Sequence, residues 1–469
     1  MSAERKVIPI QPNGGAELVP LFEAQKTVYP RTVDGFFQNW RWAMVWLTQL
    51  AFYGTAWLQW GERQALLFDL EARRFYIFGL VLYPQDFIYL AGLLVISALA
   101  LFLFTAVAGR LWCGFSCPQT VYTEIFLWIE RRIEGDRGAR MKLDAAPLSL
   151  EKLVKKWSKH IAWIVFALWT GFSFVGYFTP IRELAMSFIT TTMGPWEVFW
   201  VLFYGLATYG NAGFLREQVC KYMCPYARFQ SAMFDRNSLI ISYDAARGEP
   251  RGSRSRNADP RKEGLGDCID CKLCVQVCPT GIDIRKGLQL ECIACAACID
   301  ACDDVMQRMR YAPGLIRYAT ENSMEGKRTR FVRPRTIVYG VLLFALIAGF
   351  AAAVAGRQLV EVDVIRDRNS LYRQLADGSI ENVYTLRLIN KDTQPHTLRL
   401  DVSGLQDATL DSEHSEYRVG AGEVVSIPVR VRAPRHATGG SVEFKFLARP
   451  VADDGSESSA VARFVAPAR

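Results

Sequence analysis

The chain contains the run Cys268-Ile-Asp-Cys271-Lys-Leu-Cys274-Val-Gln-Val-Cys278-Pro279, followed by Cys292-Ile-Ala-Cys295-Ala-Ala-Cys298-Ile-Asp-Ala-Cys302. Both runs have the spacing C-x2-C-x2-C-x3-C. Three thiolates two residues apart bind one [4Fe–4S] cubane, and the fourth cysteine crosses to the other cluster. The spacing therefore predicts a ferredoxin-like domain with two [4Fe–4S] clusters. The first cluster is assigned Cys268, Cys271, Cys274 and Cys302, and the second is assigned Cys278, Cys292, Cys295 and Cys298. Structural zinc is disfavoured, because four-cysteine zinc sites have two C-x2-C pairs with a longer gap.

Acidic residues crowd the second run: Asp300, Asp303 and Asp304, with Asp303 where proline usually follows the last cysteine. Negative charge near a cluster lowers its reduction potential. The alternative interpretation is that these carboxylates form the solvated face of a small domain.

A second cysteine pattern is Cys113-Gly-Phe-Ser-Cys117-Pro118, repeated as Cys220-Lys-Tyr-Met-Cys224-Pro225. The match continues upstream, since Pro84-Gln-Asp86 and Pro195-Trp-Glu197 precede the two copies at similar distances. This indicates an internal duplication of a helix-pair unit.

An approximate twofold arrangement of the copies would bring four thiols together. Four soft ligands suit Cu(I) or an additional iron–sulfur site, and the thioether of Met223 is a further candidate ligand. The alternative is that the pairs Cys113/Cys117 and Cys220/Cys224 are buried structural thiols beside a proline that ends a helix.

Membrane insertion is predicted by the hydrophobic share of 51% and by five stretches without Asp, Glu, Lys or Arg. About 20 apolar residues of helix are needed to cross a bilayer. The five predicted spans cover residues 42–60, 87–109, 161–181, 198–215 and 336–356. The long polar segment before the first span is unlike a cleavable signal, so the first helix is expected to stay in the protein.

Orientation follows from the basic residues, because basic loops are retained in the cytoplasm. Ten Lys or Arg residues lie in 110–159 and twenty-one in 216–335. We therefore expect a bacterial inner-membrane protein. Its segments would be 1–41 cytoplasmic, 42–215 with four spans, 216–335 cytoplasmic with the ferredoxin-like domain at about 260–310, 336–356 as the fifth span, and 357–469 periplasmic. The net charge of +8 is explained by this topology and not by nucleic-acid binding.

Only His160 of the four histidines borders a predicted span, which excludes haem held by two histidines across spans. A stretch rich in Arg, Gly and Pro, residues 244–266, is interpreted as a flexible tether that lets the cluster domain move. After the last span, period-two alternation in 383–389, 396–402, 424–431, 441–447 and 460–465 predicts an all-β immunoglobulin-like sandwich.

Taken together, the five spans, the two C-x3-C-P motifs, the ferredoxin insert and the C-terminal sandwich resemble the CcoG/FixG/RdxA family of cytochrome oxidase accessory proteins. The resemblance implies reduction of Cu(II) to Cu(I) on the cytoplasmic side, for assembly of a cbb-type oxidase. The implied partners are the lipid bilayer, copper ions, a copper chaperone or copper-exporting ATPase, and oxidase assembly factors. The electron donor is not identified, a homodimer stays open, and no catalytic residues are expected beyond the redox centres.

Two other classes of function stay open. One is a membrane polyferredoxin, like NapH and NosR, that relays electrons from quinol. The absence of a redox motif after residue 356 counts against an outward relay. The other is a non-enzymatic assembly scaffold whose clusters sense iron or redox state.

Overall fold

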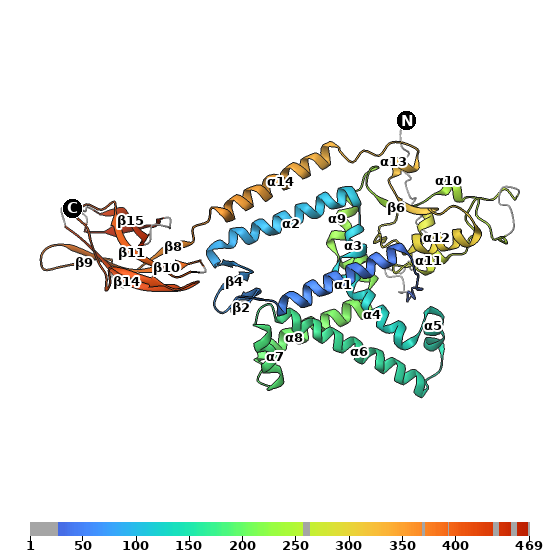
Figure 1. Cartoon of the computed structure of the whole chain (residues 1–469), viewed down its shortest axis with the longest axis horizontal. Coiled ribbons are helices and arrows are strands. Elements are labelled where there is room, and N and C mark those ends of the chain that lie inside the picture. Colours follow the sequence, from blue (N-terminus) through green and yellow to red (C-terminus); the bar gives the residue numbers. More distant parts are fainter. Residues whose placement is uncertain are drawn as a thin grey trace, which may run out of the picture.

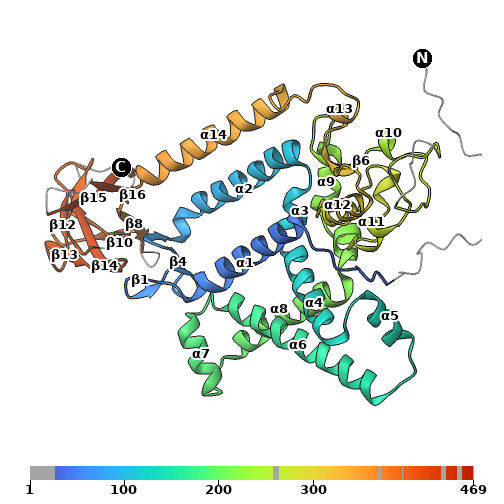
Figure 2. The ribbon, with the colours of Figure 1, turned by 45° about the vertical axis from the view of Figure 1, so that its right-hand side comes forward.

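The computed structural model describes residues 27–256, 263–367, 371–392, 394–434, 440–451 and 457–467. The molecule is elongated, with a layer of helices in the middle, the cysteine-rich part at one end and a β-sandwich at the other (Figure 1). The same three parts are separate in the turned view of Figure 2.

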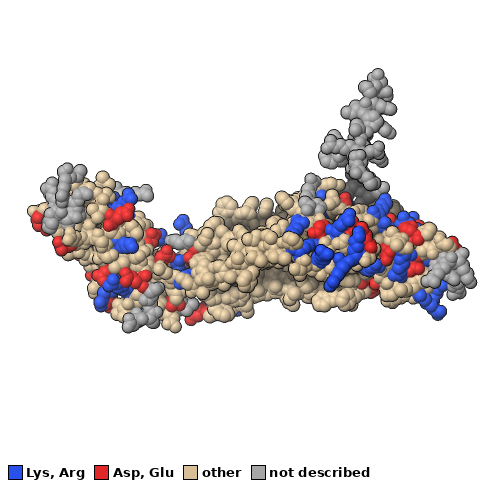
Figure 3. Space-filling view, turned by 90° about the horizontal axis from the view of Figure 1, so that it is seen from above, with Lys and Arg blue, Asp and Glu red and all other residues tan. Residues whose placement is uncertain are grey.

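Four helices are long and apolar enough to cross a membrane. They are α2 (Phe87–Ala108), α6 (Leu150–Val175), α8 (Pro195–Thr208) with its π-helical continuation Tyr209–Leu215, and α14 (Pro334–Ala355). The most apolar parts of α2 and α14 bury none of their residues inside the protein, as expected for helices that face lipid. Charged side chains gather at the two ends of the molecule, and the band between them is nearly free of charge (Figure 3).

The first predicted span corresponds to α1 (Phe36–Trp57), which has 22 residues but is not among these four helices. Its first turns are polar, and Gln38 and Arg41 are buried against the cysteine-rich part. The helix begins six residues before the predicted span, which starts at residue 42. Membrane crossing by α1 therefore stays a prediction.

Helices α6 and α8 pack closely through small residues. A Cβ atom on Gly171 would lie 2.4 Å from the carbonyl oxygen of Val201 and 2.9 Å from the backbone nitrogen of Gly205. Such contacts let two helix backbones approach in a membrane. These contacts fix α6 and α8 relative to each other, next to the second C-x3-C-P motif.

Shorter elements complete the helical part. The helices are α3 (Leu111–Phe115), α4 (Pro118–Glu134), α5 (Arg137–Ala145), α7 (Ile181–Ile189) and α9 (Pro225–Met233). Beyond α1, the chain forms the hairpin β1 (Gln59–Trp60) and β2 (Arg63–Gln64), then the small sheet of β3 (Leu66–Asp69), β4 (Arg74–Ile77) and β5 (Leu80–Leu82).

The cysteine-rich part is bracketed by β6 (Ile240–Tyr243) and β7 (Ile316–Ala319), which pair antiparallel. Between them lie α10 (Ala245–Gly248), α11 (Leu273–Gln276) and α12 (Ala297–Met309), and α13 (Glu321–Met324) follows β7. The strand pair joins the segment that enters the cysteine-rich part to the segment that leaves it. The cysteine-rich part is therefore held at both of its chain ends.

The predicted tether is wrong for its described residues, 244–256 and 263–266. The backbone nitrogen of Gly252 donates to the carbonyl oxygen of Cys268 at 3.2 Å, and that of Gly266 donates to Pro250 at 2.8 Å. Arg247 forms an ion pair with Asp267 at 2.6 Å. The stretch is part of the cysteine-rich fold, because its polar backbone is used in these hydrogen bonds.

The C-terminal part is a two-sheet β-sandwich, as predicted. One sheet has the order β12 (Thr409–Asp411), β14 (Val424–Ala433), β10 (Ile380–Asn390) and β8 (Val360–Arg366), with β9 (Arg373–Gln374) also on β10. The other has the order β13 (Glu416–Val419), β11 (His396–Ser403), β15 (Ser441–Pro450) and β16 (Ser458–Val465). The buried rings of Tyr384, Phe444, Phe446 and Phe464 fill the core between them.

Candidate metal centres

The two ferredoxin-spaced runs follow the same backbone path. Asp270 and Lys272 in the first run and Ala294 and Ala296 in the second have positive φ, at 53°, 57°, 56° and 61°. Left-handed backbone costs roughly 1–2 kcal/mol per L-residue, so it persists where the surroundings require it. Backbone N–H groups in such turns form a concavity that binds anions. The loops are therefore shaped to wrap an anionic group.

Thiol set I consists of Cys268, Cys271, Cys274 and Cys302, the four ligands predicted for the first cluster. All four line one cavity together with residues of α11 and α12. Burial raises the pKa of Cys274 and of Cys302 to about 12, and the neighbouring thiols of the set act in the same direction. Arg285, whose side chain pairs with Asp270 and Asp283, opposes this at Cys274.

Thiol set II consists of Cys278, Cys292, Cys295 and Cys298, the ligands predicted for the second cluster. Burial raises the pKa of Cys292 to about 12 and that of Cys298 well above its usual range, and the charges of the other thiols in the set add to both shifts. The cysteines of each predicted set therefore lie near one another, and their assignment to two clusters stays a prediction.

Thiol set III consists of Cys113, Cys117, Cys220 and Cys224, from the two C-x3-C-P motifs. In each motif the first cysteine lies in a short helical turn after an apolar helix. The second cysteine is extended, at φ −60° and −79°, and its proline begins a new helix, α4 or α9. Proline suits the first position of a helix because its missing N–H is not needed there.

The two motifs converge, so that set III comes from both halves of the duplication. Burial raises the pKa of Cys113 to about 11 and that of Cys220 to about 12, and each thiol is further influenced by thiols of the other motif. Met223 is not drawn into this group. Its side chain is 59% exposed, so the structure places it at the surface.

Set III lies directly against the loop of set II. A Cβ atom on Gly114 would lie 2.7 Å from the carbonyl oxygen of Ala294 and 2.8 Å from the Cα of Cys295. Cys113 and Cys220 pack against the buried cluster that contains Cys295, with Cys298 beside it. Metal centres on the two sets would be neighbours with no intervening element.

The donor sets fit iron–sulfur clusters. Each of sets I and II offers four free thiols, which are buried or partly buried except for the exposed Cys271. The loop of each set contains two residues with left-handed backbone. Within the described ranges, no three His, Cys, Asp or Glu side chains are gathered tightly enough to hold a single metal ion. A cubane distributes its thiolates over four iron atoms, so its ligands need not converge on one point.

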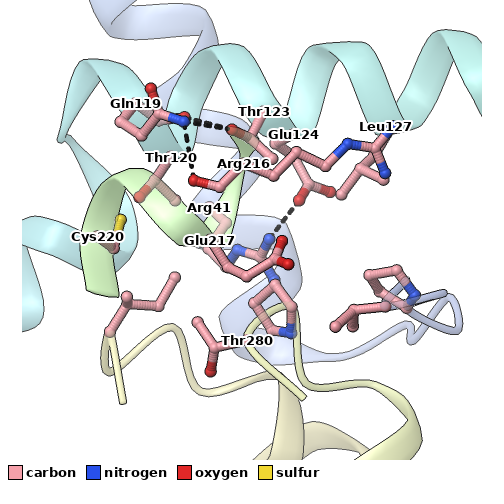
Figure 4. A pocket seen from close by; sticks show the side chains of 14 residues that line it. Arg41, Gln119, Thr120, Thr123, Glu124, Leu127, Arg216, Glu217, Cys220 and Thr280 are labelled. Atoms are coloured by element: carbon pink, nitrogen blue, oxygen red, sulfur yellow. Dashed lines mark hydrogen bonds and ion pairs between the residues drawn. The ribbon is translucent and has the colours of Figure 1, made fainter. Parts of the chain in front are cut away.

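A pocket of about 40 Å³ opens between α4 and the second C-x3-C-P motif on one side and the set II loop on the other (Figure 4). Cys220 and Thr280 lie on opposite walls, and the pair Arg41–Glu124 closes one side. Gln119 donates to the carbonyl oxygen of Arg216 at 3.1 Å. Sequence reasoning missed this pocket, because its residues come from segments far apart in the chain.

The acidic residues near set II are not one solvated face. Asp300 is 7% exposed and accepts hydrogen bonds from the backbone nitrogens of Phe37 and Gln38 at 3.2 and 2.8 Å. Asp303 accepts from the backbone nitrogen of Gly314 at 2.7 Å. Asp304 pairs with Arg308 at the surface and fits the predicted solvated face. One sequence feature could have indicated the role of Asp300. Gly35, the residue before α1, has no side chain to cap the helix, so the cap must come from another residue.

Three family models match parts of the chain. A model described as a 4Fe-4S dicluster domain matches residues 215–321, and one described as a 4Fe-4S binding domain matches residues 90–135. The model for the IG-like fold at the C-terminal of FixG matches residues 350–467. These matches confirm the predicted iron–sulfur and immunoglobulin-like parts.

Curated relatives match over most of the chain. Nitrogen fixation protein FixG of Rhizobium meliloti (strain 1021) is 39% identical over 428 residues, which are 83% of this chain and 82% of the relative. Protein RdxA of Cereibacter sphaeroides is 41% identical over 435 residues, 89% of this chain and 91% of the relative. Among solved structures, a FixG-related protein from Vibrio parahaemolyticus is 29% identical, covers 23% of this chain and 97% of that chain, and has a TM-score of 0.21.

Proposed function

This chain belongs to the FixG/CcoG family of membrane-associated iron–sulfur redox proteins, and from that premise we propose that it reduces Cu(II) to Cu(I). Copper is the substrate, and thiol set III is its candidate binding site. The described thiols are not gathered tightly enough to hold a single ion, so set III would have to close around the copper ion. When bound, [4Fe–4S] clusters on sets I and II supply single electrons at low potential.

The observation that supports this proposal is the contact between set III and set II. Gly114 brings the first C-x3-C-P motif against Ala294 and Cys295, and no side chain separates them at that point. Electron transfer between two centres needs such proximity. An ion held by set III would therefore be reduced from the side of set II.

The pocket beside Cys220 supports copper as the ion. Oxygen and nitrogen ligands suit Cu(II), whereas thiolates suit Cu(I). The pocket is lined by Thr120, Thr123 and Glu124 next to Cys220. A Cu(II) ion bound by Glu124 would displace its ion pair with Arg41. A Cu(II) ion would meet hard ligands on entry, and soft ligands would retain it after reduction.

We further propose that this reaction takes place on the cytoplasmic side of a bacterial inner membrane, with the sandwich in the periplasm. The basic segments 110–159 and 216–335 support this orientation. A copper chaperone or copper exporter would then receive Cu(I), for assembly of a cbb-type oxidase.

The test uses full-length protein with iron–sulfur clusters reduced by dithionite and freed of excess reductant. Adding Cu(II) should reoxidise the clusters, and their visible absorbance measures this reoxidation. The double variant C113S/C117S should keep the iron content but lose copper binding and most of the reoxidation rate. Unchanged copper binding in the variant would place the metal elsewhere, and clusters that stay reduced would refute the reductase activity.

A second candidate function, electron relay from membrane quinol, is favoured by a groove between α1, α4 and α6. The groove has a volume of about 450 Å³ and an almost wholly apolar lining that includes Trp42, Trp46 and Trp128. Gln49 also lines it, and its Oε1 atom is buried without a hydrogen-bond partner. Apolar grooves with few polar groups are typical of ligand sites. A quinol head group would donate to this oxygen.

Anaerobic addition of a short-chain quinol to oxidised protein tests this candidate. Cluster reduction that is lost in Gln49→Leu but kept in Thr48→Val would support quinol as the donor. Thr48 is a suitable control on the same helix because its hydroxyl bonds only to backbone carbonyls of Met44 and Val45. Equal rates in both variants would reject the groove as the donor site.

A further inference from the structure

Arg110 is a buried arginine between thiol sets II and III. It is 4% exposed and lies where α2 has ended and α3 begins. Its guanidinium donates to the carbonyl oxygens of Leu290 and of Cys292, the latter at 3.3 Å, in the loop of set II. It also donates to the carbonyl oxygen of Ala227 in α9, after the second C-x3-C-P motif. One side chain therefore connects three segments around the two sets.

The charge of Arg110 has no carboxylate partner among the described residues. The other two buried arginines each pair with a glutamate, Arg41 with Glu124 and Arg140 with Glu130. The Nε atom of Arg110 has no hydrogen-bond partner either. An unpaired buried charge is costly, so a buried arginine normally has an anionic neighbour.

The acidic groups on which Arg110 acts are thiols from both sets and the phenol of Tyr226. Its charge interacts with Cys113 and Cys220 of set III and with Cys292 of set II. These thiols become anionic when they ligate metal. Metal–thiolate centres on sets II and III would therefore supply the negative charge beside Arg110. No described carboxylate supplies it.

A second buried polar group points to the same conclusion for set III. Gln230 is fully buried, and its Oε1 accepts a hydrogen bond from the thiol of Cys113 at 3.4 Å. Its Nε2 has no hydrogen-bond partner among the described residues. A metal-bound Cys113 sulfur has no proton to donate, and a turned amide would then donate to it instead. Both donors without a partner are thus explained by a thiolate.

We infer that Arg110 is the shared counter-charge of thiol sets II and III, a positioning residue that sets the reduction potentials of the metal centres on both. The inference rests on the proposed function in so far as set III holds metal. A nearby positive charge stabilises the reduced and more negative form of a centre. Loss of the charge should therefore lower the potential.

The experiment compares Arg110→Gln, Arg110→Lys and Arg285→Gln in full-length, anaerobically purified protein. Two properties are measured in the absence of copper: the iron content, and the reduction potentials from a redox titration monitored by electron paramagnetic resonance. The result is therefore independent of whether the protein reduces Cu(II). Arg285→Gln is the matched control, because Arg285 acts on Cys274 of set I.

Arg110→Gln is expected to shift one cluster to lower potential, by at least a tenfold change in the ratio of reduced to oxidised form, which is 59 mV for one electron. Arg110→Lys should restore most of the shift, and Arg285→Gln should leave that cluster unchanged. Iron loss in Arg110→Gln but not in Arg110→Lys would also support the inference, because it would show that the positive charge is needed to retain the cluster. Wild-type potentials in Arg110→Gln, or iron loss in both Arg110 variants, would overturn the inference.

Discussion

Gly114 is a residue at which the helical part and the cluster-binding part touch closely. Because a Cβ atom there would lie 2.7 Å from Ala294 O and 2.8 Å from Cys295 Cα, the substitution Gly114→Ala should force the two backbones apart. Such overpacking costs roughly 1–3 kcal/mol. We expect a lower midpoint of thermal unfolding and slower reoxidation of the clusters by Cu(II).

Gly138→Ala is the control for this prediction. Gly138 also lies in a short helix, but a Cβ atom there would have no heavy atom within 4 Å. Alanine favours helix over glycine by about 1 kcal/mol, so this variant should be neutral or slightly stabilised. Equal effects of the two substitutions would show that the contact at Gly114 is unimportant.

The cysteines of sets I and II were predictable from the sequence, because cluster ligation requires fixed short spacings such as that of Cys268, Cys271 and Cys274. Arg110 and Asp300 were not predictable. Their roles depend on partners more than a hundred residues away, such as Cys292 for Arg110 and Gln38 for Asp300. No local pattern carries that information.

At the scale of elements, α1 is held to the cluster-binding part by a cap from another helix. Gly35 has no side chain to cap α1, and the carboxylate of Asp300 on α12 accepts from Phe37 and Gln38 instead. A lost cap costs roughly 0.5–2 kcal/mol. Asp300→Ala should therefore speed hydrogen exchange in the first turn of α1, whereas Asp300→Asn should retain most of the protection. Wild-type exchange in Asp300→Ala would contradict the capping role.

Helices α4, α5 and α6 are joined by a buried charge network centred on Glu130. It pairs with Arg140 at 3.0 Å, Arg216 at 3.1 Å and Lys159 at 3.5 Å. Burial by itself raises the pKa of Glu130, but the charges of Arg216, Arg140 and Lys159 outweigh it and hold the pKa below its usual 4.5. The stabilisation is present above that value and is lost as the pH falls below it.

Glu130→Gln should destabilise the protein by roughly 3–5 kcal/mol at neutral pH, because Arg140 and Arg216 lose their buried partner. Lys159 keeps its ion pair with Glu134. The variant's stability should also depend less on pH below pH 4.5 than that of the wild type. Hydrogen exchange of α4 measures this dependence. Glu151→Gln serves as the control, since Glu151 is exposed and pairs only with Lys155. Parallel acid profiles for Glu130→Gln and wild type would count against the network.

Apolar runs located α2, α8 and α14 well, because lipid-facing residues need no tertiary partner. The predicted span 161–181 is displaced from α6, which covers Leu150–Val175 and is partly buried in the protein. The predicted span 336–356 corresponds to Pro334–Ala355, and 87–109 to Phe87–Ala108. The tether interpretation of 244–266 was wrong for the described part for the opposite reason. Its Arg, Gly and Pro content is typical of linkers, and the hydrogen bonds that order it involve the backbone, which composition does not report.

At the scale of the whole molecule, the sandwich is docked on the end of α2 that lies away from the cysteines. Lys391 forms ion pairs with Asp86 at 2.8 Å and Glu361 at 2.7 Å, and Tyr83 donates to the carbonyl oxygen of Gly422 at 3.0 Å. Asp86 is 7% exposed, so removal of Lys391 would leave a buried unpaired carboxylate.

Lys391→Met should release the sandwich and increase proteolysis of the link between α14 and β8, residues 356–359. Lys445→Met is the control, because Lys445 is exposed on β15. Protection of the link in Lys391→Met equal to that in the control would show that the ion pair does not hold the two parts together. The arrangement of the parts was not predictable, since Asp86 and Lys391 are far apart in sequence.

The central claim is that electrons from thiol sets I and II reach a copper ion on set III. The most direct measurement is the amount of Cu(I) formed when excess Cu(II) is added to fully reduced protein, captured by a Cu(I)-specific chelator after the reductant has been removed. One electron per cluster predicts about two Cu(I) per chain beyond the amount formed by the same protein with oxidised clusters, because free thiols also reduce Cu(II) as they form disulfides. The variant C113S/C117S should show a large loss of rate with unchanged iron. Clusters that remain reduced in the presence of Cu(II), or a variant as fast as the wild type, would contradict the claim.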